Sequence, residues 1–165
     1  MIVSIIVFII IVSLDQISKA LIFGTEARSI IGNMLWFQSE KNTGAAFSML
    51  SGNNIFFIIF SSVLCVIFIY LLFSKKIFVS RLEKISIAII LGGAVSNLID
   101  RILFTYVRDF IYLKFINFAV FNIADMAITV GAILLIISIL FFQKKETKDG
   151  WIKFRTHCSR SRRED

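Results

Sequence analysis

Four long apolar stretches constrain this chain more than any other feature of its sequence. They cover residues 2–23, 55–73, 85–104 and 124–142, and each is close to the ~20 residues that a helix needs to cross the hydrocarbon core of a bilayer. The chain is 58% hydrophobic, with 18 phenylalanines and no proline, whereas soluble domains are about 45–50% apolar. The sequence therefore predicts a mainly α, polytopic membrane protein with four transmembrane helices.

The chain length leaves room for a single membrane domain and a tail. We predict a transmembrane domain over residues 1–143, with connections at 24–54 and 105–123, followed by a basic tail at 144–165. The first apolar stretch has no basic region before it and no small-residue cleavage site after it. We therefore interpret it as a retained helix and not as a signal peptide.

The positive charge predicts the orientation of the helices. The net charge is +7, and the basic residues cluster at 75–84 and 144–163. Cytoplasmic segments of membrane proteins carry an excess of lysine and arginine, so both clusters and both termini are expected in the cytoplasm. This placement of the charge argues against nucleic acid as a partner. Anionic lipid is the expected partner of the tail.

The cysteines and the histidine do not indicate a metal site or a disulfide. Cys65 lies in an apolar stretch, whereas Cys158 and His157 lie in the basic tail. Neither cysteine has the spacing of a metal-binding motif or of a disulfide framework. We therefore predict a protein without a metal or another cofactor.

Two acids, Asp109 and Asp125, stand at the ends of a short connection beside long apolar stretches. A carboxylate there is costly unless it is partnered or has a function. Two carboxylates brought together share a proton and separate their pKa values, which suits general acid–base hydrolysis by water. An alternative for Asp125 is a capping box, since Asn122 three residues earlier is a favoured N-cap.

Other polar residues interrupt the first and third apolar stretches. Asp15 and Lys19 are four residues apart, which places them on one helix face. They could simply neutralise each other. Asn97, Asp100 and Arg101 form a polar group near the end of the third stretch. The alternative for that group is an Asp100–Arg101 pair at the membrane surface.

The connection between the first two stretches contains short strand-like segments over residues 30–51, broken by turn residues. Within it, residues 41–48 combine small side chains with Asn42, and they could equally form a turn into the next helix. With the predicted orientation, polar residues from five segments meet at the outer membrane boundary. They are Asp15, Lys19, Asn42, Asn97, Asp100, Arg101, Asp109, Asn122 and Asp125.

Four motifs along the chain resemble those of the signal peptidase II family, the lipoprotein signal peptidases. They are Asp15-Gln-Ile-Ser-Lys19, Asn42-Thr-Gly-Ala-Ala-Phe-Ser48, Gly92-Gly-Ala-Val-Ser-Asn-Leu-Ile-Asp-Arg101, and Val107-Arg-Asp-Phe-Ile with Phe121-Asn-Ile-Ala-Asp125. The motifs occur in the family's order and extend from the first to the fourth apolar stretch. One motif alone would be weak, but four in order are specific.

The resemblance implies an aspartic endopeptidase of the bacterial plasma membrane, with a small extracytoplasmic β-cradle. It implies cleavage of diacylglyceryl-modified prolipoproteins before the lipidated cysteine, and inhibition by globomycin-type peptides. The family's catalytic pair falls on Asp109 and Asp125. The remaining polar positions, Asp15, Lys19, Asn42, Asn97, Asp100, Arg101 and Asn122, match residues that support the site or the substrate. We expect a monomer with its active site at the outer face.

Two other classes of protein compete with this interpretation. A small transporter would use intramembrane Asp and Lys as ion ligands or relays, but it predicts polar residues near the bilayer midplane and often inverted repeats. In a non-enzymatic scaffold, paired acids at the ends of one connection would have no function. The clustering of polar residues at one membrane boundary favours the peptidase.

Overall fold

The structure is a computed structural model that describes residues 1–44, 52–74 and 80–141. The basic tail with His157 and Cys158, and the end of the second motif with Ser48, lie outside the described residues. The elements are α1 (Ile2–Ile22), β1 (Arg28–Ile31), β2 (Leu35–Asn42), α2 (Asn54–Phe73), α3 (Arg81–Phe104), β3 (Val107–Leu113), the 3-10 helix η2 (Lys114–Ile116) and α4 (Ile123–Phe141).

The described residues contain four helices that are long and apolar enough to cross a membrane, which confirms the four-helix prediction. Three of them begin within one residue of the expected position. Helix α3 begins at Arg81 and not near residue 85. The reason is a capping box, in which the Ser80 hydroxyl accepts a hydrogen bond from the Glu83 N–H while the Glu83 carboxylate accepts one from the Ser80 N–H.

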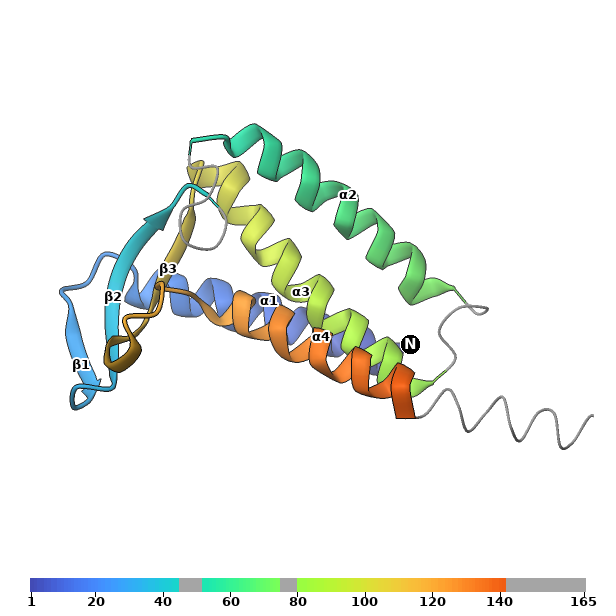
Figure 1. Ribbon diagram of the computed structural model, residues 1–165. Coiled ribbons are helices and arrows are strands. Elements are labelled where there is room, and N and C mark those ends of the chain that lie inside the picture. The colour runs from blue at the N-terminus through green and yellow to red at the C-terminus, as the bar shows by residue number, and fades with distance from the viewer. Residues whose placement is uncertain (45–51, 75–79, 142–165) are drawn as a thin grey trace, which may run out of the picture.

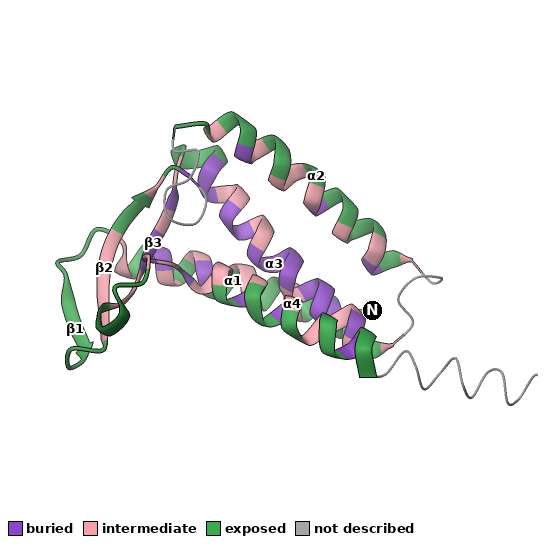
Figure 2. Ribbon diagram, in the orientation of Figure 1, coloured by how far each residue is buried: buried purple, intermediate pink, exposed green. Residues whose placement is uncertain are grey.

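Helix α3 is the central element of the bundle, with α1, α2 and α4 packed around it (Figure 1). Buried residues concentrate on α3, whereas α1, α2 and α4 carry many exposed large apolar side chains (Figure 2). Lipid is the solvent that such outward apolar faces require, because no other part of the described chain covers them. The core therefore follows α3, and the other helices separate it from lipid.

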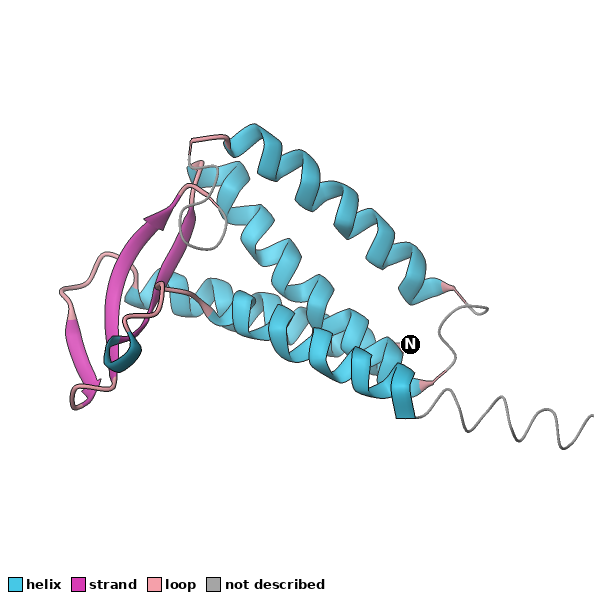
Figure 3. Ribbon diagram, in the orientation of Figure 1, coloured by secondary structure: helices cyan, strands magenta, loops and turns pink. Residues whose placement is uncertain are grey.

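A small antiparallel sheet lies across one end of the bundle, in the order β1-β2-β3 (Figures 1 and 3). Strand β2 lies in the segment 30–51, where the sequence predicted strands, and β1 overlaps the beginning of that segment. The third strand, β3, lies in the connection 105–123 and carries Asp109, which pairs with Glu40 of β2. Backbone hydrogen bonds also join Ile111 of β3 to Phe121, just before α4. The sheet therefore holds Asp109 close to the beginning of α4.

Candidate active site

Asp109 is a buried carboxylate on β3 with an amide donor on each oxygen. Asp109 is only 1% exposed. The Asn42 side-chain amide donates to Oδ2 at 2.9 Å, and the Asn122 amide donates to Oδ1 at 2.6 Å. Burial, reinforced by the charge of Asp125, raises the pKa of Asp109 from 3.8 to about 7, even though the two amides and Lys19 favour its ionised form. Near neutral pH this carboxyl can therefore hold a proton.

Asp125 lies in the first turn of α4, and its position combines two interactions. It forms the expected capping box with Asn122: the Asp125 N–H donates to Asn122 Oδ1 at 2.9 Å, and the Asn122 N–H donates to Asp125 Oδ2 at 3.2 Å. Its other oxygen accepts a hydrogen bond from the Asn97 amide at 2.8 Å. The capping interpretation is thus correct but incomplete, because α3 also holds this carboxylate.

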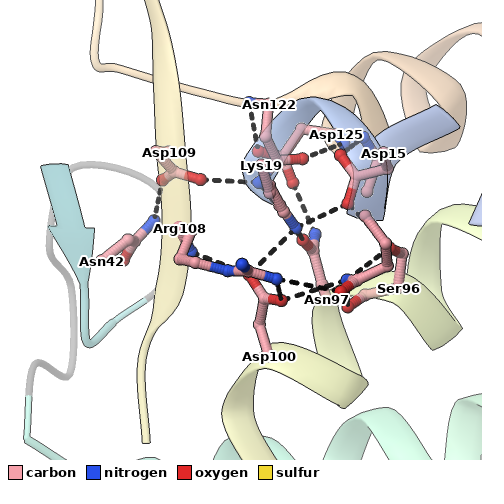
Figure 4. Close-up of polar contacts among 12 residues, drawn as sticks. Asp15, Lys19, Asn42, Ser96, Asn97, Asp100, Arg108, Asp109, Asn122 and Asp125 are labelled. Carbon is pink, nitrogen blue, oxygen red and sulfur yellow. Dashed lines mark hydrogen bonds and ion pairs between the residues drawn. The ribbon is translucent and has the colours of Figure 1, made fainter. Parts of the chain in front are cut away.

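Asn97 and Asn122 connect the two acids (Figure 4). The Asn122 amide that donates to Asp109 lies 3.2 Å from Asn97 Oδ1, and Asn97 donates to Asp125. The Lys19 ammonium donates to the same Asn97 oxygen at 2.9 Å. Because this oxygen accepts two donors, the amide nitrogen of Asn97 must face Asp125. The amides are therefore oriented to donate to both carboxylates.

Lys19 is a fully buried cation shared by two acids. Its ammonium lies 2.7 Å from Asp15 and 3.2 Å from Asp100, and all three side chains have no exposed surface. A buried charge is tolerated only with such partners. The Asp15–Lys19 pair expected from the sequence is therefore present, but it is part of a larger group that joins α1 to α3.

Asp100 and Arg101 do not form the surface pair considered from the sequence. Asp100 has no exposed surface and pairs with Lys19 and with Arg108 of β3. Arg101 is 9% exposed, donates to the Gly44 carbonyl at 3.0 Å, and lies 5.0 Å from the centre of the Phe57 ring. That interpretation is wrong because the sheet packs over the end of α3 and supplies other partners. Arg101 instead links α3 to the end of β2 and to α2.

The structure brings all the polar residues expected at the site into one connected group, and it adds three that the sequence analysis missed. Gln16 donates to Ser96 and to Asp100, and Arg108 donates to both Gln16 and Asp100. Ser96 donates to Asp15 at 2.7 Å. Each of the three is next to an expected residue in the sequence. Arg108 had the clearest signal, a charge beside Asp109 that would be costly without a partner.

A cavity of about 660 Å³ is lined by Asp125, and Asp109 adjoins its wall through the Asn42 amide. One part of its wall is polar and contains Asn42, Asn97, Arg101 and Asp125, and the remainder is mainly apolar. The apolar wall comes from β3, η2, the segment before α4 and the first turns of α4, and it includes Ile116, Phe118, Phe121, Met126, Ile128 and Val130. Such a cavity suits a substrate that is largely apolar and carries one polar, reacting group.

The membrane bundle and this acidic centre place the chain among multi-pass membrane enzymes. Two solved bacterial membrane enzyme structures, determined by the in meso method at 2.3 Å and 1.9 Å resolution, share its fold. Their TM-scores are 0.77 and 0.75, and their sequences are 34% and 33% identical to this chain. The first match covers 84% of this chain and 87% of the other, and the second covers 85% and 94%.

The chain belongs to the signal peptidase II family, whose model, described as signal peptidase (SPase) II, matches residues 7–141. A lipoprotein signal peptidase from Shouchella clausii is 40% identical over 147 residues, covering 87% of this chain and 96% of the relative. Another from Lactobacillus johnsonii is 38% identical over 145 residues, covering 86% and 94%. The chain is therefore a peptidase of this family and a multi-pass bacterial membrane protein.

Proposed function

We propose that Asp109 and Asp125 form an aspartic dyad that removes signal peptides from diacylglyceryl-modified prolipoproteins. Cleavage takes place immediately before the lipidated cysteine, with water as the nucleophile. The convergence of these two carboxylates on the Asn97–Asn122 amide pair, beside the cavity, carries this proposal. The membership of the family supports it, since the motifs of lipoprotein signal peptidases fall on these positions.

The surroundings of the two acids assign them different roles. Burial keeps the carboxyl of Asp109 protonated up to about pH 7, so Asp109 serves as the acid that polarises the scissile carbonyl. Asp125 lines the cavity and, ionised, serves as the base for water. A pair of carboxyls in unlike environments divides acid and base work in this way.

The reaction then needs only these two groups and one water. Asp125 takes a proton from water while the hydroxyl attacks the carbonyl carbon, and Asp109 gives its proton to the carbonyl oxygen. When the tetrahedral intermediate collapses, Asp125 passes its proton to the leaving amine, and Asp109 recovers a proton from the new carboxyl group. Each acid thus returns to its starting state.

The other polar residues support this centre and do not react. Asn42, Asn97 and Asn122 orient the carboxylates, and the buried charges of Asp15, Lys19 and Asp100 fix α1 against α3. Arg101 lines the cavity and faces the polar part of the substrate. The apolar wall receives the lipidated substrate from the outer leaflet, and a globomycin-type peptide would occupy the same cavity. The enzyme acts as a monomer.

Two carboxyl-to-amide substitutions test the dyad. We expect purified Asp109→Asn and Asp125→Asn proteins to lose cleavage of a diacylglyceryl-prolipopeptide by ~10²–10⁴-fold, the range of general acid–base catalysis. Both should fold, because an amide fills the same volume. Glu40→Gln is a matched control, since Glu40 is an exposed carboxylate that pairs with Asp109 across the sheet and should keep full activity. Full activity of either folded Asp variant would remove that residue from the dyad.

A further inference from the structure

The residue before each catalytic acid belongs to the same buried network. Arg108 precedes Asp109 on β3, and Ala124 precedes Asp125 at the beginning of α4. The Arg108 guanidinium reaches α1 and α3, while the Ala124 N–H points to a carboxylate of α1. Both residues therefore have a partner on α1, and Arg108 also has one on α3.

Four hydrogen bonds lead from one residue to the other (Figure 4). Arg108 Nη2 donates to Gln16 Oε1 at 2.9 Å, and Gln16 Nε2 donates to Ser96 Oγ at 2.9 Å. Ser96 Oγ donates to Asp15 Oδ2 at 2.7 Å, and the Ala124 N–H donates to Asp15 Oδ1 at 2.8 Å. Every link is a direct contact between groups that are buried or partly buried.

Arg108 makes several contacts besides this series of four hydrogen bonds. Its Nη2 and Nε lie 2.8 and 3.3 Å from the two oxygens of Asp100, and its backbone N–H donates to Asp100 at 2.9 Å. Its guanidinium also lies 4.5 Å from the centre of the Phe104 ring. A two-pronged contact of this kind fixes orientation as well as charge.

The charges of this network balance only when Arg108 is present. Asp15 and Asp100 are negative, Lys19 and Arg108 are positive, and all four side chains are between 0% and 12% exposed. Without Arg108 the group would carry one uncompensated negative charge among buried side chains. Removing one partner of a buried pair is costly because the other charge remains, so the network would rearrange around Lys19, which also contacts Asn97.

On the other side of Asp109, the strand is attached to a different place. The Phe110 and Ile111 N–H groups both donate to the Phe121 carbonyl, at 3.0 and 2.8 Å. These bonds hold β3 to the segment that precedes α4, but they do not reach α1 or α3. Among the residues that the structure describes, Arg108 is thus the residue of β3 whose hydrogen bonds go directly to α1 and α3, whereas Asp109 is linked to α3 through Asn122 and Asn97.

We propose that Arg108 is a positioning residue that sets the separation of the two catalytic carboxyls, acting through Gln16, Ser96 and Asp15 on the beginning of α4. The inference rests on the proposed dyad, because the separation matters only if both acids act on one water and one carbonyl. The guanidinium of Arg108 donates its hydrogen bonds to Gln16 and Asp100, so it acts through these partners and not by contact with the substrate. Substitution of Arg108 should therefore slow the chemical step and leave substrate binding unchanged.

The test is a double-mutant cycle on Arg108→Gln and Gln16→Met with purified protein and a diacylglyceryl-prolipopeptide. We expect each single variant to lower kcat, Arg108→Gln by about 10²-fold, the size of effect that a displacement near 1 Å causes, with KM unchanged. The double variant should lose little more kcat than the worse single variant, because both substitutions break the same series of hydrogen bonds. Arg108→Lys, which keeps the charge but not the two-pronged contact, should recover part of kcat.

Lys41→Gln is the matched control, because Lys41 pairs with Arg108 across the sheet, is exposed, and contacts the Tyr106 ring. It should retain kcat. An unchanged kcat in folded Arg108→Gln, losses that multiply in the double variant, or a rise in KM alone would each overturn the positioning role. If Arg108→Gln does not fold, Gln16→Met decides, and a normal kcat in it overturns the inference. Activity in Asp109→Asn would instead reject the dyad itself, so the two failures are distinguishable.

Discussion

Asp109 shows how one residue can couple the stability of the fold to pH. It is 1% exposed, and burial together with the charge of Asp125 raises its pKa from 3.8 to about 7. The folded protein therefore keeps this proton up to about pH 7, while the unfolded chain releases it near pH 3.8. Stability depends on the difference in bound protons between the two states, so the contribution of Asp109 is full below pH 3.8 and is lost as the pH rises to about 7.

In detergent, the Tm of the wild-type protein should fall between pH 5 and pH 8, and the fall should be smaller in Asp109→Asn, because an amide cannot ionise. Glu40→Gln should retain the wild-type slope, since Glu40 is exposed on the facing strand. Melting curves at several pH values measure the difference. Equal slopes in wild type and Asp109→Asn would show that Asp109 does not carry the proton.

At the scale of elements, α3 brings α4 close enough for Asn97 to reach Asp125. A Cβ added to Gly93 would collide with the Ala124 carbonyl oxygen and would lie 2.8 Å from Ile128 Cγ1. Neighbouring Gly92 faces the other way, where a Cβ would lie 2.9 Å from Ile11 Cβ of α1. One pair of glycines therefore allows close packing of α3 against two helices.

This packing predicts different effects for two alanine substitutions. Gly93→Ala should cost about 1–3 kcal/mol of stability, as overpacking does, and should also lower kcat because it displaces the first turn of α4 that carries Asp125. Gly92→Ala should cost a similar amount of stability but a smaller part of kcat, since it acts on α1. Thermal unfolding and cleavage rates of the two variants provide the comparison. A larger loss of kcat in Gly92→Ala would contradict this role of Gly93.

The elements also show what the sequence could and could not predict. The four helices were predictable because each is an apolar stretch of bilayer length. Strand β3 was not predicted as a strand from its residues, because Arg108 and Asp109 interrupt any simple alternation and its pairing depends on β2 and Phe121. Gln16 and Ser96 are neutral residues within apolar helices, and only their partners on other elements show that they belong to the network.

At the scale of the whole molecule, the network lies at one end of the bundle. Helices α1 and α3 end beside the sheet, α2 and α4 begin there, and the amino terminus lies at the opposite end (Figure 1). Helix α3 begins at that opposite end, and its first residues include the basic residues Arg81 and Lys84 (Figure 1). If positive segments remain in the cytoplasm, the sheet and the two acids face outward, where exported prolipoproteins present their cleavage sites.

The orientation can be measured by labelling cysteines with a membrane-impermeant maleimide. Cys65 is buried in α2, so the wild-type protein should be labelled at Cys158 in the tail, and only after the cells are permeabilised. A Glu26→Cys, Cys158→Ser variant places a thiol at an exposed position between α1 and β1, and it should be labelled in intact cells. Cys158→Ser alone is the control and should remain unlabelled under both conditions. The reverse pattern would place the acids at the cytoplasmic face, where a lipidated substrate in the outer leaflet could not reach them.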